Sequence, residues 1–416
     1  MHYVIIGNGA AGTQAAETIR KNDPLGEITI ISDEPYPAYS RCLLPEYLAG
    51  ERALEAMHFK SSKFYKKNRI RARLGEKVVS ISPEEKELHL EKGEKISYDC
   101  LLLATGSSAL LPAFPGVEEE GVHLFRSLDD ARKIKETARH SRRAVVVGGG
   151  FVGLEAAYAL YKWGLEVTVI EKEPQILPGQ FDAKAASILQ NDMQAEGLRI
   201  ITGNGISEII GPSRWLRLFG NSGKGVILES GERLKAELVV LATGIRPNTS
   251  LAARAGVALN QGIIVDGFLA TNLPDVYGAG DVVETIDAVS GRMSLSPIWP
   301  NAVVQGRIAG LNMAGKRRLY SKQIGMQNAV EFREVPAMAI GLTQLPPGGE
   351  ELVVYQPHHG FYKKLILKDD VLLGMILVGD VSQAGVYAAL IKNKVSVKSF
   401  KHQLLKQDFG YSFLIS

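Results

Sequence analysis

The feature that most constrains how this chain folds is a succession of apolar strand, glycine turn and helix that occurs twice. Residues 3 to 12 read YVIIGNGAAG, and residues 144 to 153 read AVVVGGGFVG. Glycines spaced as G-x-G-x-x-G permit a tight turn and a close approach of a pyrophosphate, and the following helix offers N–H groups at its positive end. The glycines concerned are Gly7, Gly9, Gly12, Gly148, Gly150 and Gly153. Two such turns predict an α/β chain with two Rossmann-like dinucleotide-binding domains.

An acidic residue is expected after the second strand of each domain, where it accepts hydrogen bonds from ribose hydroxyls. The strand EITIIS ends at Asp33 and Glu34, of which Asp33 is the first choice and Glu34 the alternative. The strand EVTVIE ends at Glu171. A glutamate there repels a 2'-phosphate, so the second domain is expected to prefer NAD to NADP, although Lys172 beside it weakens that preference.

Length and composition limit the number of domains, the class of protein and the kind of partner. A chain of 416 residues is too long for one core, so two or three domains are expected. The mean hydropathy of +0.01, with no apolar run of about 18 residues, argues against a membrane protein. A net charge of +3 is too small to indicate a nucleic-acid partner. With two cysteines and no signal peptide read at the N-terminus, a cytoplasmic location is expected.

Two strands that end in Ala-Thr-Gly mark the expected crossings between domains. They are LLLATGS and LVVLATGIRPN, both followed by prolines, so boundaries are predicted near residues 112 and 247. Residues 80 to 98 alternate as a meander does. From residue 320 a smaller α+β domain is expected, with a hairpin that turns at Asp369 and Asp370 and a helix after it.

Two further stretches fit a flavin. In TNLPDVYGAGDVVE, Asp281 beside Gly280 can bind a ribitol hydroxyl. In WPNAVVQGRIAGLNMAG, a helix starting around Asn301 presents a positive end that suits the N1 and O2 edge of a flavin, where negative charge collects on reduction. Helix packing through small residues explains the same stretch, and both interpretations stay open.

The ordered motifs resemble the two-dinucleotide flavoprotein reductases of the pyridine nucleotide-disulfide oxidoreductase superfamily, closely over about residues 1 to 315. The stretches YSRCLLPEYLAG and FYKKLILKDDVLLGMILVGD look most like NADH:rubredoxin oxidoreductases, NADH oxidases and the flavoprotein part of nitrite reductases. The resemblance implies an FAD domain formed by residues 1–112 and 247–319, an NAD(H) domain at 113–246, and a C-terminal cap or interface domain at 320–416. It leaves a monomer and a homodimer open, and it implies no metal.

The resemblance also implies which residues contact the cofactors. Those expected at FAD are Gly7, Gly9, Ala11, Gly12, Asp33, Glu34, Arg41, Val78, Ala104, Thr105, Gly106, Arg126, Gly280, Asp281 and Trp299. Those expected at NADH, with NADPH less favoured, are Gly148, Gly150, Gly153, Glu155, Glu171 and Gly244, and Glu155 is expected to reach the nicotinamide amide.

Cys42 is the one candidate for a catalytic side chain. Pro45 predicts that a helix begins between Cys42 and Leu44, and a thiol at a helix start next to Arg41 has a lowered pKa. No C-x-x-x-x-C pair is present, so dithiol chemistry is excluded. In related oxidases, peroxidases and coenzyme A-disulfide reductases one cysteine here cycles through sulfenate or a mixed disulfide, whereas the neighbours of Cys42 are closer to the rubredoxin and nitrite-reductase flavoproteins. A redox thiol and a packing residue beside the flavin both remain open.

The expected function is the transfer of hydride from NADH to FAD and of electrons to a small redox protein of the rubredoxin kind or to oxygen. The alternatives are a single-cysteine NADH oxidase, peroxidase or coenzyme A-disulfide reductase, and an FAD-binding subunit of a larger electron-transfer complex. The segment KSSKFYKKNRIRAR, residues 60 to 73, holds seven basic residues and no acidic one. It suits an acidic acceptor protein, or it is simply a solvated surface.

Overall fold

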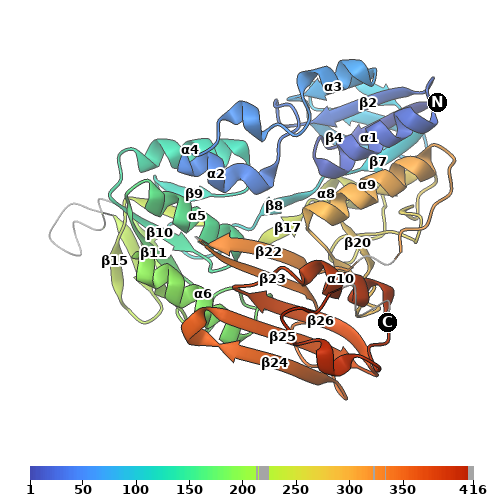
Figure 1. The fold of residues 1–416 in the computed structure, drawn as a ribbon. Helices are drawn as coiled ribbons and strands as arrows, with labels where there is room; N and C mark the ends of the chain where they lie inside the picture. The colour runs from blue at the N-terminus through green and yellow to red at the C-terminus, as the bar shows by residue number, and fades with distance from the viewer. Residues whose placement is uncertain (212–213, 215–223, 322–323, 333, 411–416) are drawn as a thin grey trace. The chain divides into compact units, whose positions relative to one another are not determined.

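The computed structural model describes residues 1–211, 214, 224–321, 324–332 and 334–410 (Figure 1). By its internal contacts the chain divides into two compact units. The first unit comprises Met1–Ser40, Leu54–Ser108 and Arg246–Gly325, and the second comprises Arg41–Ala53, Ala109–Ile245 and Met326–Ser416. The described residues contain no helix that is both long enough and apolar enough to span a bilayer.

The first unit is built on a parallel sheet in the order β19-β7-β1-β2-β3. Its strands are β1 (His2–Ile6), β2 (Glu27–Ser32), β3 (Ile70–Leu74), β7 (Cys100–Leu103) and β19 (Val276–Gly278). The inner strands β7, β1 and β2 are buried on both faces and are nearly continuous apolar runs, with Val4 and Ile5 wholly inaccessible. The edge strand β3 carries two arginines and is mostly half-buried.

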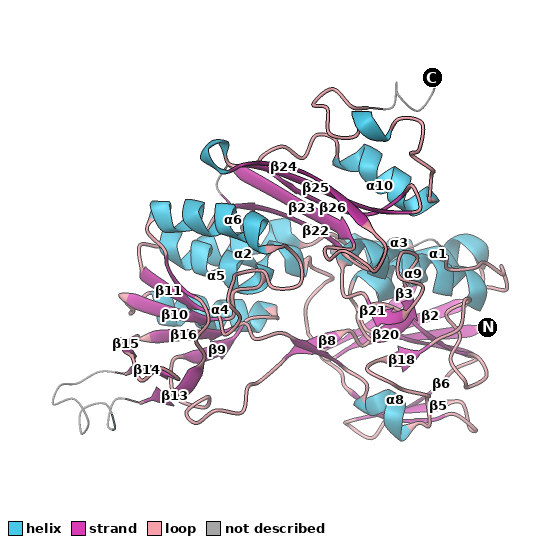
Figure 2. Cartoon of the chain, turned by 90° about the horizontal axis from the view of Figure 1, so that it is seen from below, coloured by secondary structure: helices cyan, strands magenta, loops and turns pink. Residues whose placement is uncertain are grey.

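Helices α1 (Ala10–Asn22) and α9 (Trp299–Met313) lie side by side in this unit, as both views show (Figures 1 and 2). Small residues allow the contact, because a Cβ atom on Gly306 would lie 2.1 Å from the carbonyl oxygen of Ala11. The remaining elements are α3 (Ser62–Lys67), α8 (Ser250–Arg254), the turn η2 (Leu54–Met57), the meander β4 (Val78–Ser82), β5 (Glu87–Leu90) and β6 (Lys95–Ser97), and the strands β18 (Ile263–Ile264), β20 (Val283–Ile286) and β21 (Met293–Leu295). The meander confirms the alternation noted in the sequence.

The second unit repeats the parallel arrangement in the order β12-β11-β10-β16-β9. The strands are β9 (Val122–Leu124), β10 (Arg143–Val147), β11 (Glu166–Ile170), β12 (Arg199–Ile201) and β16 (Leu238–Leu241). The helices are α2 (Leu44–Ala49) with the turn η1 (Arg41–Leu43) before it, α4 (Leu128–Ala138), α5 (Phe151–Lys162) and α6 (Ala183–Glu196), and an antiparallel sheet joins β13 (Ile206–Ile210), β14 (Gly225–Leu228) and β15 (Arg233–Lys235). Two of the unit boundaries fall within short strands, one in β8 (Ser107–Ala109) and one in β17 (Ile245–Pro247).

An antiparallel sheet completes the second unit in the order β22-β23-β26-β25-β24. Its strands are β22 (Gln327–Phe332), β23 (Val335–Gly341), β24 (Glu350–Gln356), β25 (Phe361–Lys368) and β26 (Val371–Val378), followed by α10 (Ala384–Asn393), with short turns η3 (Pro357–His359) and η4 (Lys401–Gln403). The β25–β26 hairpin turns at Asp369 and Asp370, as predicted, and both have positive φ of 51° and 56°. Figure 2 shows α10 on one side of this sheet and α6 on the other.

The structure therefore confirms the predicted mixed α/β class with two parallel-sheet cores. The grouping by contacts places Arg41–Ala53 and Met326–Ser416 with the second parallel sheet. The division into an FAD domain, an NAD(H) domain and a separate C-terminal domain stays a prediction.

Candidate functional site

The first glycine turn, between β1 and α1, has the shape that a pyrophosphate needs. Gly7 has φ of +121°, and a Cβ atom there would lie 2.0 Å from the carbonyl oxygen of Ala104. A Cβ atom on Gly12 would lie 2.0 Å from the carbonyl oxygen of Gly7, whereas a Cβ atom on Gly9 would meet nothing within 4 Å. The turn is thus closed on its inner side and open at Gly9. Helix α1 begins directly after Gly9 and has no acidic residue in its first turn, so an anion is not repelled there.

The second glycine turn, between β10 and α5, repeats this geometry in the other unit. Gly148 has φ of +110°, and a Cβ atom on it would lie 2.3 Å from the carbonyl oxygen of Ala242. A Cβ atom on Gly153 would lie 1.9 Å from the carbonyl oxygen of Gly148, and the position of Gly150 is open. Helix α5 begins after Gly150, again with no acid in its first turn. The residues of both turns therefore fit a dinucleotide diphosphate.

Glu171 lies beneath the second turn. Its side chain is 6% exposed, Gly149 N donates to Oε2 at 2.6 Å, and Glu173 N donates to Oε1 at 2.9 Å. A carboxylate that accepts hydrogen bonds from two backbone N–H groups is held in one orientation. The sequence-predicted ribose acid is consequently fixed at the rim of the turn before any ligand arrives.

The acidic residues near the first glycine turn lie at other positions, relative to the second strand, than Glu171 does. Gly7 N donates to Ile31 O, as Gly148 N donates to Ile170 O, both at 2.8 Å. Ser32 therefore occupies the place of Glu171, while Asp33 and Glu34 come one and two residues later. Asp33 is exposed, and Glu34 is half-buried and accepts a hydrogen bond from the Tyr39 hydroxyl at 2.9 Å. The choice between the two acids stays a prediction.

Three polar supports of the first site were missed in the sequence. The Ser107 hydroxyl donates to Asp281 Oδ2 at 2.9 Å, and Gly280 N donates to Gln305 Oε1 at 2.7 Å. The Tyr65 hydroxyl donates to Asn8 Oδ1 at 2.9 Å, inside the glycine turn itself. Each pair is separated by at least 25 residues, so only the fold brings its members together.

The Ala-Thr-Gly triplet after β7 is held by a neighbouring segment. Ala104 N donates to Ile6 O at 2.9 Å, which continues the sheet, and the Thr105 hydroxyl donates to Asn248 O at 2.9 Å. Gly106 has φ of +65° with open space at its Cβ position, as has Gly244 of the second triplet, at φ of +115°. The space beside the backbone is therefore open at both glycines.

Helix α9 begins at Trp299, two residues before the predicted start at Asn301, because Pro300 is tolerated in a first turn. Its first residue packs edge-on against Phe59, with ring centroids 4.8 Å apart. Asn301 is buried and donates to Ser296 Oγ at 2.5 Å and to Ile324 O at 3.0 Å. Val78, the remaining residue expected at FAD in this unit, is 8% exposed and belongs to the apolar core.

Arg41, Cys42 and Arg126 lie in the second unit. The Arg41 guanidinium donates to Arg126 O at 2.9 Å, so the structure brings these two expected FAD contacts together. Cys42 lies in η1, is exposed, and forms no disulfide. Helix α2 starts at Leu44, within the predicted range, but with six residues it supplies little helix dipole.

The surroundings of the other cysteine make its thiol unreactive. Cys100 lies in β7 and is 3% exposed, and burial raises the pKa of its thiol to about 12. A reagent that reacts with a native thiol of this chain will accordingly find Cys42.

Glu155 on α5 is the most perturbed carboxyl group near the second turn. Burial, and next the negative charge of Glu46, raise its pKa from 4.5 to about 7. Glu46 comes from α2, which packs on α5, and Arg52 forms an ion pair with it at 2.5 Å. A half-buried carboxyl that titrates near neutral pH is able to donate or to accept a hydrogen bond.

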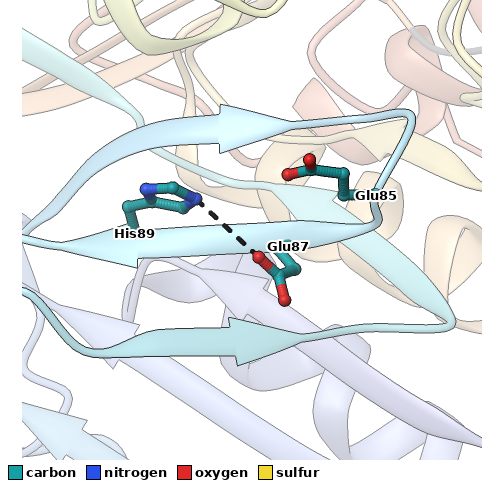
Figure 3. Close-up of side chains that lie close together, drawn as sticks. All are labelled: Glu85, Glu87 and His89. Atoms are coloured by element: carbon teal, nitrogen blue, oxygen red, sulfur yellow. Dashed lines mark ion pairs between the residues drawn. The ribbon is translucent and has the colours of Figure 1, made fainter.

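One group of side chains has the spacing of metal ligands. Glu85, Glu87 and His89 lie close together on the β4–β5–β6 meander, with their ligand atoms within 4.8 Å of one another (Figure 3). However, Lys95 donates to Glu87 at 3.0 Å and the group is partly solvated, as is common for acidic surface clusters without a metal. We assign no metal to it.

Two parts of the chain match known protein families. The family model described as pyridine nucleotide-disulphide oxidoreductase matches residues 1–306, and the one described as rubredoxin NAD+ reductase C-terminal domain matches residues 332–395. An assimilatory nitrate reductase electron transfer subunit from Bacillus subtilis is 32% identical over 407 residues, which are 97% of this chain and 51% of that protein. The NADH-dependent phenylglyoxylate dehydrogenase subunit epsilon of Aromatoleum evansii is 31% identical, over 97% of this chain and 94% of that one.

A solved structure of a NAD-dependent persulfide reductase from A. fulgidus superposes with a TM-score of 0.88 at 27% identity, covering 99% of this chain and 80% of that one. These findings define the two-dinucleotide fold of the flavoprotein reductases. The chain belongs to the pyridine nucleotide-disulphide oxidoreductase family, whose members use FAD and NAD(P)H. It spans about half the length of the two Bacillus subtilis relatives that it matches.

Proposed function

We propose that this chain is an FAD-dependent NADH oxidoreductase that passes electrons to a small redox protein of the rubredoxin class. The observation that carries the proposal is the pair of glycine turns with the same closed inner side and the same open position, one in each unit. One turn suits the diphosphate of a resident flavin, and the other suits that of an exchanging nicotinamide nucleotide.

The preference for NADH rests on Glu171. Its carboxylate is buried beneath the second turn and carries its charge where a 2'-phosphate of NADPH would lie. The neighbouring Lys172 side chain is 78% exposed and points its charge to solvent, at 4.0 Å from Glu173. Repulsion by Glu171 therefore outweighs attraction by Lys172.

Bound FAD would accept hydride from the nicotinamide and release electrons singly or in pairs. The residues of the chain have the tasks of binding and orienting. Gly9 and the first turn of α1 would bind the flavin diphosphate, and Asp281, held by Ser107, would bind a ribitol hydroxyl. Gln305 fixes the Gly280 turn beside it. Glu155 holds a proton near neutral pH at the position expected for the nicotinamide amide.

The acceptor is proposed from the C-terminal match to the rubredoxin NAD+ reductase model. The basic segment supports it less than its sequence suggests. Lys60 pairs with Glu17 at 2.7 Å, and Arg73 pairs with Glu76 at 2.7 Å and with Glu94. Lys63, Lys66, Lys67 and Arg71 are exposed and form no ion pair with a described residue. The two aromatics between them, Phe64 and Tyr65, are buried, so they offer no stacking surface to a nucleic acid.

The test is anaerobic titration of the purified chain with NADH. We expect a yellow protein whose flavin absorbance is bleached by one equivalent of NADH and restored by oxidised rubredoxin. Colourless protein that also fails to take up added FAD contradicts the flavin assignment. A flavin that NADH does not reduce contradicts the assignment of the second turn.

Two other functions have specific support. Similarity over nearly the whole length to a dehydrogenase subunit favours a flavin-binding subunit of a larger complex. Robust steady-state turnover of NADH by the isolated chain with rubredoxin or an artificial acceptor excludes that alternative.

The exposed Cys42 and the similarity to a persulfide reductase favour thiol chemistry, which a Cys42→Ser variant tests below. The cytoplasmic location and the choice between monomer and homodimer stay predictions.

A further inference from the structure

Asn8 provides the side chain at the tip of the first glycine turn, between Gly7 and Gly9. Its Nδ2 donates to Tyr36 O at 3.2 Å, and its Oδ1 accepts from the Tyr65 hydroxyl at 2.9 Å. Because a backbone carbonyl can only accept a hydrogen bond, these partners fix the orientation of the amide. Both polar atoms of the Asn8 side chain are thus engaged by the protein.

Tyr65 connects this amide to a third segment of the chain. Its hydroxyl accepts from Ala38 N at 3.1 Å, which leaves the hydroxyl hydrogen for Asn8 Oδ1. Tyr65 is 8% exposed, and its ring packs edge-on against Phe64 with the centroids 5.4 Å apart. A ring in such close packing has little freedom to turn. Three directed hydrogen bonds therefore join residues 36–38, α3 and the glycine turn.

The backbone of Asn8 makes no hydrogen bond to another residue in the described ranges. Asn8 does not have a positive φ, so a residue with a side chain is accommodated at this position. Since its N–H group is not used within this part of the chain, the group is left for a ligand, and successive N–H groups of such turns bind phosphate oxygens. The side chain of Asn8 is accordingly what fixes the residue.

The second glycine turn is fixed in another way at the equivalent position, Gly149. Gly149 N donates to Glu171 Oε2 at 2.6 Å, and its carbonyl oxygen accepts from Leu177 N at 2.8 Å. With both backbone groups bonded, this turn needs no side chain for support. The two turns therefore share their steric outline but not the means by which their tips are held.

We infer that Asn8 and Tyr65 are positioning residues of the first nucleotide site, and that their hydrogen bond holds the turn in the shape that binds a diphosphate. A turn that is held in its binding shape before the ligand arrives loses less free energy on binding, so the ligand is bound more tightly. The inference rests on the proposed assignment of FAD to this turn. It adds what keeps the flavin bound there between turnovers.

The test measures FAD binding to the full chain, freed of flavin, by the quenching of flavin fluorescence. Asn8→Ala and Tyr65→Phe are each expected to raise the Kd for FAD by about tenfold or more, because each breaks the same buried hydrogen bond. Since the two residues act through one contact, the double variant should bind FAD within about twofold of the weaker single variant.

Tyr98→Phe is the matched control. Tyr98 is 3% exposed and lies in the same unit, and its hydroxyl has no hydrogen-bond partner among the described residues. Removing that hydroxyl should leave the Kd for FAD unchanged. A spectroscopic readout separates positioning from general support of the fold. The ³¹P resonances of bound FAD should shift in Asn8→Ala and Tyr65→Phe, and they should not shift in Tyr98→Phe.

The inference is overturned if either single variant binds FAD as tightly as the unchanged chain does, or if the two losses multiply in the double variant. Unmoved ³¹P resonances in both single variants would also overturn it, because the diphosphate would then be held without Asn8 and Tyr65. Failure of the unchanged chain to bind FAD would refute the proposed function together with this inference, whereas the other outcomes refute the inference alone.

Discussion

At the scale of single residues, Glu155 is expected to make the stability of the fold depend on pH. Because its pKa is raised from 4.5 to about 7, the folded state binds the proton more tightly than the unfolded state does. This group stabilises the fold fully below about pH 4.5, and that contribution is lost as the pH rises through about 7. The loss is roughly 3 kcal/mol at most, and less in practice, because the side chain is only half-buried.

Replacing Glu155 by Gln is expected to remove this dependence. Between about pH 5 and 8, the free energy of unfolding of the variant should decline less than that of the unchanged chain, as urea denaturation at a series of pH values measures. The matched control is Glu91→Gln, a change at an exposed acid. Parallel pH profiles for the unchanged chain and Glu155→Gln would show that Glu155 titrates normally.

Cys42 is the other residue whose chemistry a single substitution decides. In the native chain, one thiol is expected to react rapidly with a thiol reagent, because Cys42 is exposed and Cys100 is buried with a raised pKa. Cys42→Ser should abolish that labelling while NADH turnover with rubredoxin stays within about twofold. A loss of turnover of tenfold or more would instead favour the thiol-cycling enzymes.

At the scale of elements, the two strand–turn–helix units are a matched pair. A Cβ atom on Gly7 or on Gly148 would overlap a carbonyl oxygen of its own unit, and both residues have positive φ. Gly7→Ala is therefore expected to reduce the flavin retained on purification. Gly148→Ala should keep its flavin but raise the KM for NADH at least tenfold. The reverse pattern, read from flavin absorbance and steady-state kinetics, would exchange the roles of the two turns.

The α1–α9 contact is a second element-scale feature with a clear steric limit. At Gly306 an added methyl group meets the backbone of Ala11, which cannot move without shifting the first glycine turn. Gly306→Ala should destabilise the chain by about 2 kcal/mol and lower its flavin content. Gly385→Ala, in α10, is the control: a Cβ atom there meets nothing within 4 Å, so stability should be unchanged or slightly higher. Equal thermal unfolding of both variants would contradict tight packing at Gly306.

At the scale of the whole chain, Asp182 joins the C-terminal sheet to the second parallel sheet. It caps α6 by accepting from Ala185 N at 3.1 Å, and it also accepts from the Tyr362 hydroxyl at 2.6 Å. Lys364, 8% exposed, lies 3.2 Å from the same carboxylate and 2.9 Å from Glu351. One acid thus satisfies a helix end, a buried phenol and a buried ammonium group.

Asp182→Ala is expected to cost about 2–4 kcal/mol, because the buried Tyr362 and Lys364 side chains lose a hydrogen-bond partner. Hydrogen exchange in β25, which carries both residues, should become faster. The control is Ser127→Ala, which removes a capping box on α4 that has no bond to the C-terminal sheet. It should cost about 1 kcal/mol without changing exchange in β25. Unchanged exchange in Asp182→Ala would show that the apolar contacts alone hold the sheet.

Most of the fold could be predicted, because its signals are local. A glycine turn, an Ala-Thr-Gly strand end or a hairpin at two aspartates is decided by backbone sterics within a few residues. The supports of the site were missed for the opposite reason. Ser107 and Asp281 are 174 residues apart, and a serine after a strand carries no sign of a distant acid. The sequence predicts a helix that starts around Asn301, whereas α9 begins at Trp299, because Pro300 is tolerated in a first turn.

The sequence by itself therefore determined that there are two dinucleotide turns, that a mixed α/β class carries them, and to which family the chain belongs. All three follow from steric requirements that a short stretch expresses completely. Tertiary structure alone decided that Ser32, and not Asp33, shares the register of Glu171. It also decided that burial and the charge of Glu46 raise the pKa of Glu155, and that Asp182 contacts Tyr362 and Lys364 of the C-terminal sheet. These depend on side chains meeting across elements that are far apart in sequence, where burial and charge act through space and not along the chain.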